Sequence, residues 1–271
     1  MIAFAGNSIL CRLALGSGSI DVASFTAVRI LSGAVVLLLL VAVQQRSLRI
    51  GRPRIGAVLA LFLYMICFSF AYLSLSAGTG ALLLFGAVQI TMLGVALIYG
   101  ERFSATAWAG LVLAFCGLIY LVAPGVAAPD PAGAVLMVIA GIAWGAYSLL
   151  GRGASDPLLE TARNFVYCVP FAVVVFALML SDMDITATGL VLAIASGALA
   201  SGVGYAIWYA ALPALSAGNA ATVQLSVPVI AALGGVIFIA ETFSIRIGVA
   251  TLLTIGGIWL VLAQRETKEE R

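Results

Sequence analysis

Apolar runs long enough to cross a bilayer follow one another along almost the whole chain, and charged residues are confined to the short breaks between them. A helix needs about 20 apolar residues to cross a hydrocarbon core of roughly 30 Å. Of the 271 residues, 63% are hydrophobic and 9% are charged, and the mean hydropathy is +1.20. Soluble domains carry about 25% charged residues. We therefore expect a membrane protein with no room for a separate soluble domain.

Charged residues, glycines and prolines divide the chain into ten expected spans, at residues 2–16, 22–44, 55–75, 79–99, 104–122, 132–152, 159–181, 186–208, 216–239 and 244–264. The runs are too long for barrel strands and do not alternate with a period of two, which predicts an all-α bundle. The first span is short, so either the native N-terminus is longer or helix 1 crosses half the bilayer. No cleaved signal peptide is expected, because the chain starts without a positively charged segment.

The loop charges predict an orientation. Alternate breaks and the C-terminal tail carry most of the basic residues: Arg46, Arg49, Arg52, Arg54, Arg102, Arg152, Arg265, Lys268 and Arg271. An even number of spans places all of these on one side, which the positive-inside rule identifies as the cytoplasm. The opposite breaks carry mainly acids: Asp21, Asp130, Asp182, Asp184 and Glu241. We expect a bacterial inner-membrane protein with both termini in the cytoplasm.

Short motifs recur at an offset of 140 residues, as from Ser76 to Ser216. The paired positions are Ser76-Ala77-Gly78 with Ser216-Ala217-Gly218, Leu93-Gly94 with Leu233-Gly234, Glu101 and Phe103-Ser104 with Glu241 and Phe243-Ser244, and Gly117 with Gly257. This offset predicts two five-span halves, residues 1–124 and 125–271. Because five is odd, the second half must enter the membrane the other way up, and such inverted repeats are typical of secondary transporters.

Several function classes are disfavoured by what the sequence lacks. It has no histidine, and its four cysteines, Cys11, Cys67, Cys116 and Cys168, are scattered singly, so neither a catalytic triad nor a metal site or disulfide framework is expected. Metalloprotease and nucleotide-binding motifs are absent, as is a pair of intramembrane aspartates. The net charge of +2 is too small to suggest nucleic-acid binding. We expect neither an enzyme nor a bound cofactor.

The ends of the two halves share a pattern of small residues and glycine, at 86–94 and 227–235, followed by a glutamate and a Phe-Ser turn. In this pattern the chain resembles the EamA-type transporters of the drug/metabolite transporter superfamily, which have ten spans in two five-span units. Within that family it looks most like the YddG-like aromatic amino acid exporters, on the stretches 142–147 (IAWGAY) and 204–208 (GYAIW). The first span departs from the family pattern, with Ala5-Gly6-Asn7 where members often carry Trp-Gly.

Polar and aromatic side chains within the spans are candidates for lining a substrate pathway: Asn7, Tyr64, Ser69, Tyr72, Gln89, Trp144, Tyr147, Tyr205, Trp208, Tyr209, Asn219 and Gln224. Asn and Gln are costly in hydrocarbon unless hydrogen-bonded, so they face the bundle interior or a water-filled path. Each of them could instead link two helices. Aromatic rings can stack on a substrate side chain and attract an ammonium group through their faces.

Candidates for hinge or gating positions are Gly78, Gly80, Gly218 and Pro228, because glycine at a helix start leaves backbone N–H groups accessible and proline can kink a span. Four charged residues are expected to be structural: Arg29 and Arg163 by snorkelling or pairing with a carbonyl, Glu101 and Glu241 by capping the following helix or pairing with a neighbour. No lysine and no mid-span carboxylate is found in the spans, which disfavours phosphate-bearing cargo and proton coupling.

The resemblance and the inverted halves together predict a secondary transporter that exports neutral or zwitterionic solutes, chiefly aromatic and other neutral amino acids, by alternating access. One alternative is the same machine with another neutral cargo, such as a purine or a drug. Another is a channel or a structural bundle. The expected partners are a small-molecule substrate and membrane lipid, and a monomer is the simplest assembly.

Overall fold

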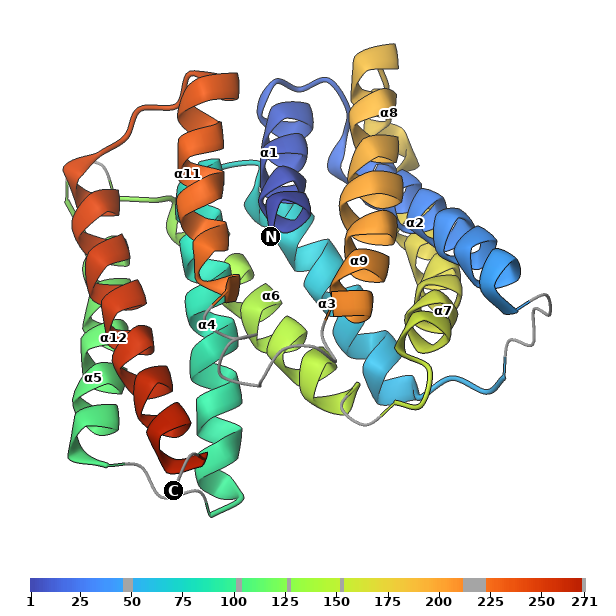
Figure 1. Cartoon of the computed structure of the whole chain (residues 1–271). Coiled ribbons are helices and arrows are strands. Elements are labelled where there is room, and N and C mark those ends of the chain that lie inside the picture. The colour runs from blue at the N-terminus through green and yellow to red at the C-terminus, as the bar shows by residue number, and fades with distance from the viewer. Residues whose placement is uncertain (46–50, 101–103, 126–127, 152–153, 212–222, 270–271) are drawn as a thin grey trace.

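The computed structural model describes residues 1–45, 51–100, 104–125, 128–151, 154–211 and 223–269 (Figure 1). Regular structure in this part of the chain is helical, and the β contact found there is an isolated bridge between Ile20 and Ile185. The expectation of an all-α fold is therefore confirmed.

The helices run back and forth across the molecule (Figure 1). They are α1 (Ile2–Gly16), α2 (Val22–Gln45), α3 (Ile55–Ala71), α4 (Ala77–Ile98), α5 (Ala105–Val122), α6 (Pro131–Leu150), α7 (Pro157–Leu178), the short η1 (Leu180–Asp182), α8 (Ala187–Ile194), η2 (Ala195–Val203), α9 (Gly204–Ala211), α11 (Ser226–Ile239) and α12 (Ile245–Glu269). The segments α8, η2 and α9 form one continuous rod, because the residues that join them keep helical dihedral angles.

Seven of the described helices, with the rod counted as one, are long and apolar enough to span a membrane. The other three, α1, α3 and α11, are apolar but have 15, 17 and 14 residues. The sequence predicted ten spans, of which only the first was expected to be short, so a full span at 55–75 is corrected. The span expected at 216–239 begins outside the described residues.

The correction at α3 has a local cause. Tyr72, Leu73 and Ser74 donate their N–H groups to carbonyls three residues back, which closes a turn after Ala71. The next helix then starts behind Ser76, whose hydroxyl accepts from the N–H of Thr79 at 3.3 Å. Because the turn contains no charged residue, glycine or proline, the sequence does not mark the break.

Helix α11 starts at Ser226, and the expected start at residue 216 lies outside the described residues. Pro228 therefore stands in the first turn of α11, where its missing N–H removes no intrahelical hydrogen bond. The kink expected at this proline stays a prediction, because residues 212–222 lie outside the described part of the chain.

Four other helices begin close to their expected starts because polar side chains cap them. The side-chain oxygens of Ser104, Asp130, Asp156 and Thr186 accept the N–H of the residue three positions later, at 3.2, 2.7, 2.9 and 3.1 Å. Such N-caps satisfy backbone donors that have no partner within the helix. The capped helices start within two residues of the predicted 104, 132, 159 and 186.

Helices α5 and α12 lie side by side on one flank of the bundle, and α2 and α7 on the other (Figure 1). Glycines permit the first contact: a Cβ atom at Gly257 would collide with the carbonyl oxygen of Gly110, and one at Gly117 would lie 2.5 Å from the hydroxyl of Thr254. Small residues at helix crossings allow backbones to approach closely, as is common between membrane helices. The glycines at positions 117 and 257 of the repeat are thus packing residues.

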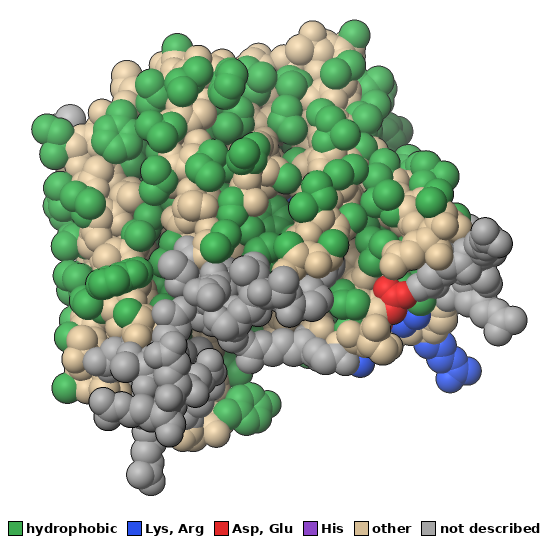
Figure 2. All heavy atoms as spheres, in the orientation of Figure 1, with side chains coloured by type: hydrophobic (Ala, Val, Ile, Leu, Met, Phe, Trp, Pro, Cys, Tyr) green, Lys and Arg blue, Asp and Glu red, His purple; other side chains and the backbone are tan. Residues whose placement is uncertain are grey.

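The two ends of the bundle differ in charge. We call the end with Asp21, Asp130, Asp182, Asp184 and Glu241 the acidic end, and the end with Arg52, Arg54 and Arg163 the basic end. Between them, hydrophobic side chains cover the face formed by α12, α11, α1 and α9, while charged side chains gather at its lower margin (Figure 2). Leu252, Ile237 and Phe238 are 75%, 71% and 70% exposed. A continuous apolar surface of this kind is unfavourable in water and suits contact with lipid.

Candidate functional site

A small cavity lies inside the bundle where α1, α3, α4, α6 and the α8–η2–α9 rod meet. It is lined by Phe4, Asn7, Tyr64, Phe68, Leu84, Phe85, Trp144, Ala200, Ser201 and Tyr205. We call it the central cavity. Its volume of about 10 Å³ is room for roughly one water molecule. The conformation described is therefore closed around the site, and a solute can enter only after helices move apart.

Trp144 holds the aromatic wall of the central cavity together. Its indole stacks on the ring of Tyr205, with centroids 5.3 Å apart and an angle of 17°, and its centroid lies 4.8 Å from that of Tyr64. Phe4 closes the group, at 6.4 Å from Trp144 and 5.7 Å from Tyr205. These rings come from four separate helices, and each such pair contributes about 0.5–1.5 kcal/mol beyond the area that it buries.

A π-helical segment supplies polar groups to the same cavity. In η2 the hydroxyl of Ser196 donates to Oδ1 of Asn7 on α1, at 2.6 Å, with both side chains buried. The hydroxyl of Ser201 lines the cavity, and within the described part of the chain it has no hydrogen-bond partner. A buried hydroxyl without a partner is unfavourable, and π-helical turns are frequent at functional sites. Ser201 is thus available to a water molecule or a solute.

Arg29 on α2 lies next to this wall and is completely buried, with 0% of its surface exposed. Its Nη2 donates to the hydroxyl oxygen of Tyr64 at 3.3 Å, and its guanidinium carbon lies 4.7 Å from the ring centroid of Phe68. Its Nε and Nη1 have no hydrogen-bond partner among the described residues. The ion pairs found in that part of the chain join Arg12 to Glu241, and Arg54 and Arg163 to Glu160.

The prediction that Arg29 snorkels or pairs with a carbonyl is therefore wrong. The reason is tertiary: α2 packs against η2 so tightly that a Cβ atom at Gly197 would collide with the carbonyl oxygen of Arg29. This contact puts Arg29 on the inner face of α2, where the side chain turns toward α3. Arg163 differs, because it lies at the basic end and pairs with Glu160 at 3.2 Å.

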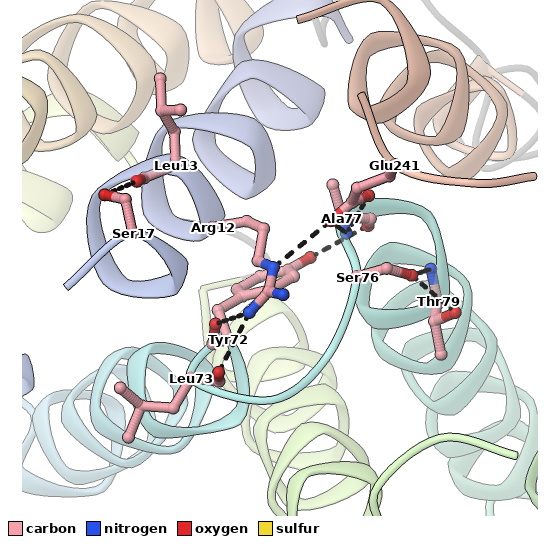
Figure 3. Close-up of polar contacts among 9 residues, drawn as sticks. All are labelled: Arg12, Leu13, Ser17, Tyr72, Leu73, Ser76, Ala77, Thr79 and Glu241. Carbon is pink, nitrogen blue, oxygen red and sulfur yellow. Dashed lines mark hydrogen bonds and ion pairs between the residues drawn. The ribbon is translucent and has the colours of Figure 1, made fainter. Parts of the chain in front are cut away.

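A polar network closes the acidic end above the cavity (Figure 3). The carboxylate of Glu241 accepts from the N–H of Ala77 at 3.1 and 2.9 Å, and its Oε1 lies 3.3 Å from Nε of Arg12. Nη1 of Arg12 also donates to the carbonyl oxygens of Tyr72 and Leu73, at 3.1 and 3.0 Å. We call these five residues the Arg12–Glu241 latch. It joins α1, the turn after α3, the start of α4 and the loop before α12.

Of the two roles expected for Glu241, capping the following helix or pairing with a neighbour, the structure shows pairing, with Arg12. The helix that Glu241 caps is α4, because Ala77 is the first residue of that helix and an anion is favoured at a helix N-terminus. Ser244 serves at the start of α12, where its hydroxyl accepts from the N–H of Ile247 at 3.2 Å. Glu101, which corresponds to Glu241 at the offset of 140 residues, lies outside the described residues.

A second small pocket lies toward the basic end, lined by Ala57, Tyr147, Leu150, Gly151, Ala154, Pro157, Glu160, Thr161 and Asn164. The hydroxyl of Tyr147 accepts from Nδ2 of Asn164 at 3.4 Å and donates to Thr161 at 3.5 Å. Its ring is 5.5 Å from that of Trp144, centroid to centroid. The pair of Trp144 and Tyr147 on α6 thus separates this pocket from the central cavity.

The remaining predicted pathway residues are not among those that line the central cavity. Ser69 donates to the carbonyl of Met65 in its own helix, and Tyr72 donates to the carbonyl of Ala77 below the latch. Gln89 is buried in α4, and Gln224 is half-buried just before α11. The ring centroids of Trp208 and Phe4 are 6.1 Å apart. Asn219 and the side chain of Tyr209 lie outside the described residues.

The predicted hinge glycines of α4 are packed rather than free. A Cβ atom at Gly78 would lie 2.8 Å from Cβ of Ala232 on α11, and one at Gly80 would lie 2.5 Å from the ring of Tyr72. Gly78 therefore marks a close crossing of α4 and α11 directly under the latch. Gly218 lies outside the described residues.

Sequence reasoning identified Asn7, Tyr64, Trp144 and Tyr205 as pathway residues, and it missed four others that matter here: Phe4, Phe68, Phe85 and Ser201. A phenylalanine in an apolar run looks the same whether it faces lipid, core or cavity. The available signal for Arg29 was its position in the middle of an apolar run with no acid nearby.

This fold, apolar outside and closed around a ring-lined cavity, defines a multi-pass helical membrane protein. The model of the EamA-like transporter family matches residues 1–123 and again residues 131–263. The chain belongs to the EamA-like transporter family, whose members are membrane transporters of small molecules.

Two curated proteins are similar to most of this chain. An uncharacterized protein of Pseudomonas aeruginosa is 49% identical over 265 residues, which cover 98% of this chain and 92% of that protein. An uncharacterized transporter of Archaeoglobus fulgidus is 22% identical over 222 residues, 79% of this chain and 78% of the relative. A solved crystal structure matches 98% of this chain and 97% of its own with a TM-score of 0.69 at 17% identity, a likeness that concerns the fold alone.

Proposed function

We propose that the protein is a secondary transporter that exports neutral or zwitterionic amino acids, aromatic ones foremost, through the central cavity by alternating access. The observation that carries this proposal is the aromatic wall around Trp144, at the meeting point of helices from both halves of the chain. Transporter sites of this kind lie near the middle of the membrane, between the two repeats.

The chemistry of the lining supports an amphipathic cargo. Ring faces such as those of Trp144 and Tyr205 suit a planar or aliphatic side chain, and their negative faces attract an ammonium group. Asn7 and Ser201, which also line the cavity, add hydrogen-bonding groups. No acidic residue is among the ten that line it, so a strongly cationic drug finds no counter-charge there.

The arrangement of the two halves supports alternating access. Residues 1–124 and 125–271 each contribute one helix to the crossings of α4 with α11 and of α5 with α12. Movement at these crossings would open one end of the cavity while the other closes. In the conformation described, the Arg12–Glu241 latch closes the acidic end, and only the layer of Trp144 and Tyr147 separates the cavity from the pocket at the basic end.

The orientation follows from charge. Arginines dominate the basic end, so the positive-inside rule favours a cytoplasmic position for this end. The acidic end then faces the outside of the inner membrane. The latched conformation is thereby the one closed to the outside, in which an exporter would load its cargo.

Two other functions remain as outcomes of the test. A purine or another planar neutral metabolite would stack on the same rings, so the transport rates of purines and amino acids must be compared directly. A channel needs an open path, whereas the central cavity has a volume of only about 10 Å³.

Flux measurements in proteoliposomes test the proposal. We expect saturable uptake of labelled phenylalanine and tryptophan. Uptake should be faster into vesicles preloaded with the unlabelled amino acid, because the binding site of a carrier reorients across the membrane faster when it is occupied. A channel would show no such stimulation. Uptake of adenine without any uptake of amino acids would overturn the choice of cargo.

A pair of variants tests the site. Trp144→Phe replaces the indole with a smaller ring and should raise the KM for phenylalanine about three- to tenfold, within the range for an aromatic pair. Trp259→Phe is the matched control, because Trp259 is 54% exposed on the lipid-facing side of α12. Equal KM values for the two variants would contradict the assignment of the cavity.

A further inference from the structure

Arg29 is a positive charge held inside the bundle without a negative partner in the described part of the chain. Two of its three guanidinium nitrogens, Nε and Nη1, donate no hydrogen bond there. The contacts that it does make, with the Tyr64 hydroxyl and with the faces of Tyr64 and Phe68, leave its charge uncompensated. A buried ion is strongly unfavourable unless it is paired, so this arrangement is suited to an anion that arrives from outside the protein.

Tyr64 connects Arg29 to the central cavity. Its hydroxyl oxygen accepts from Nη2 of Arg29, so the hydroxyl proton is directed away from the arginine. No acceptor for this proton is found among the described residues, and Tyr64 itself lines the cavity. Tyr64, a residue of the cavity wall, therefore has an unused O–H donor and a guanidinium in contact with its hydroxyl oxygen.

We propose that Arg29 and Tyr64 bind the carboxylate group of the transported solute. The inference rests on the proposed function, in that a small solute enters the central cavity when the helices part. A carboxylate oxygen accepts the Tyr64 O–H, and the guanidinium in contact with that hydroxyl supplies the compensating charge. Hydrogen bonds between ionised partners are about twice as strong as neutral ones, and a carboxylate matches the fork of an arginine.

The surroundings favour a single carboxylate over larger anions. The site offers one guanidinium and one hydroxyl, and the lining residues of the cavity include no lysine and no second arginine. A phosphate with its higher charge would lack partners for its remaining oxygens. The rings of Trp144, Tyr205 and Phe4 provide the place for an apolar group attached to the carboxylate.

This assignment changes the expected cargo. A cavity without fixed charge would favour neutral solutes and tolerate an amine as readily as an acid. With Arg29 behind Tyr64, the carboxylate becomes the required group and the amino group becomes secondary. Aromatic and aliphatic monocarboxylates, amino acids included, should bind, whereas the corresponding amines and amides should not.

Binding to the wild-type protein in detergent tests this directly. Thermal-shift titrations compare 3-phenylpropanoate with 3-phenylpropanamide, which has the same shape without the charge, and with 2-phenylethylamine. Potassium chloride at equal concentration checks for a response to any anion. We expect the carboxylate to bind at least about tenfold more tightly than the amide, as one charge-assisted hydrogen bond allows. Equal binding of acid and amide, or an equal response to chloride, would overturn the proposal.

Three variants locate the preference. Tyr64→Phe removes one oxygen atom, and Arg29→Gln removes the charge; each should reduce the tenfold preference for the acid to about twofold or less. Ser69→Ala is the control, since its hydroxyl lies on the same helix but bonds to Met65 and does not line the cavity. Retention of the full preference in Tyr64→Phe would overturn the proposal even if Arg29→Gln does not fold.

Transport distinguishes this inference from the proposed function. If the wild-type protein prefers the carboxylate in binding but moves no amino acid in vesicles, the proposed function fails and the carboxylate site stands. If phenylalanine and phenylalaninamide are carried at equal rates, the transporter stands and the carboxylate site fails.

Discussion

Arg12 near the end of α1 and Glu241 before α12 form an ion pair, with Nε of the arginine 3.3 Å from Oε1 of the glutamate (Figure 3). Their side chains are 24% and 14% exposed, so solvent screens the pair only in part. The same carboxylate caps α4 through the N–H of Ala77. One glutamate thus ties three segments together at the acidic end, and its loss should release them together.

Glu241→Gln should weaken this closure, because it keeps the shape of the side chain but removes its charge. We expect the free energy of unfolding in detergent to fall by about 1–2 kcal/mol, the range for a partly buried helix-end charge. With Ser201→Cys as a reporter in the cavity, a membrane-impermeant thiol reagent should react faster from the acidic end. Asp182→Asn, at an exposed acid of the same end, is the control, and equal labelling rates in the two variants would refute the latch.

The contact of α5 with α12 can be tested at two adjacent glycines. A Cβ atom at Gly257 would collide with Gly110 and lie 2.5 Å from the backbone nitrogen of Ala114, while one at Gly256 would have nothing within 4 Å. Gly257→Ala should therefore destabilise the protein by about 1–3 kcal/mol through overpacking. Gly256→Ala should be neutral or slightly stabilising, since alanine is the better helix former. The measurement is thermal unfolding in detergent, and similar melting temperatures would argue against this crossing.

Two serines of η2 offer a second matched pair. Ser196 donates to Asn7 at 2.6 Å, so Ser196→Ala leaves a buried amide oxygen without its donor and should cost about 1–3 kcal/mol. Ser201 has no hydrogen-bond partner among the described residues, so Ser201→Ala should leave stability unchanged or raise it slightly. Unfolding by denaturing detergent, followed by circular dichroism, measures both. A larger loss for Ser201→Ala than for Ser196→Ala would contradict the structure of η2.

Orientation in the membrane can be measured on whole cells. A cysteine at Asp182, on the acidic end, should react with an impermeant maleimide in intact cells, and one at Arg54, on the basic end, only after permeabilisation. Three native cysteines, Cys11, Cys67 and Cys168, are buried and should not be labelled. Labelling of the exposed Cys116 is measured in the parent protein and subtracted. The reverse pattern would place the basic end outside.

Helix starts were predictable from the sequence where a single residue sets them. Ser104, Asp130 and Asp156 cap the helices that follow, and the interaction spans only three residues, so no distant contact is needed to locate it. The ends of α3 and the start of α11 were not predictable in this way. The turn after α3 holds no charged residue, glycine or proline that would mark it, and the residues before α11 lie largely outside the described part of the chain.

The site was predictable only in part. Asn7, Tyr64, Trp144 and Tyr205 carry polar or ring chemistry that is unusual in an apolar run, and the structure brings them to one cavity. Tyr72 and Ser69 have the same chemistry but bond to backbone carbonyls elsewhere. Composition cannot separate these cases, because the face on which a residue lies matters only once the neighbouring helix is known.

The sequence by itself determined that this is a helical membrane protein with one acidic and one basic end. Transfer of an apolar run into hydrocarbon depends on its length and composition and needs no particular neighbour. Only the tertiary structure decided that Arg29 is buried behind Tyr64 and that Glu241 caps a helix 164 positions earlier in the chain. Such pairings arise from the packing of helix faces, which the order of residues along one run does not specify.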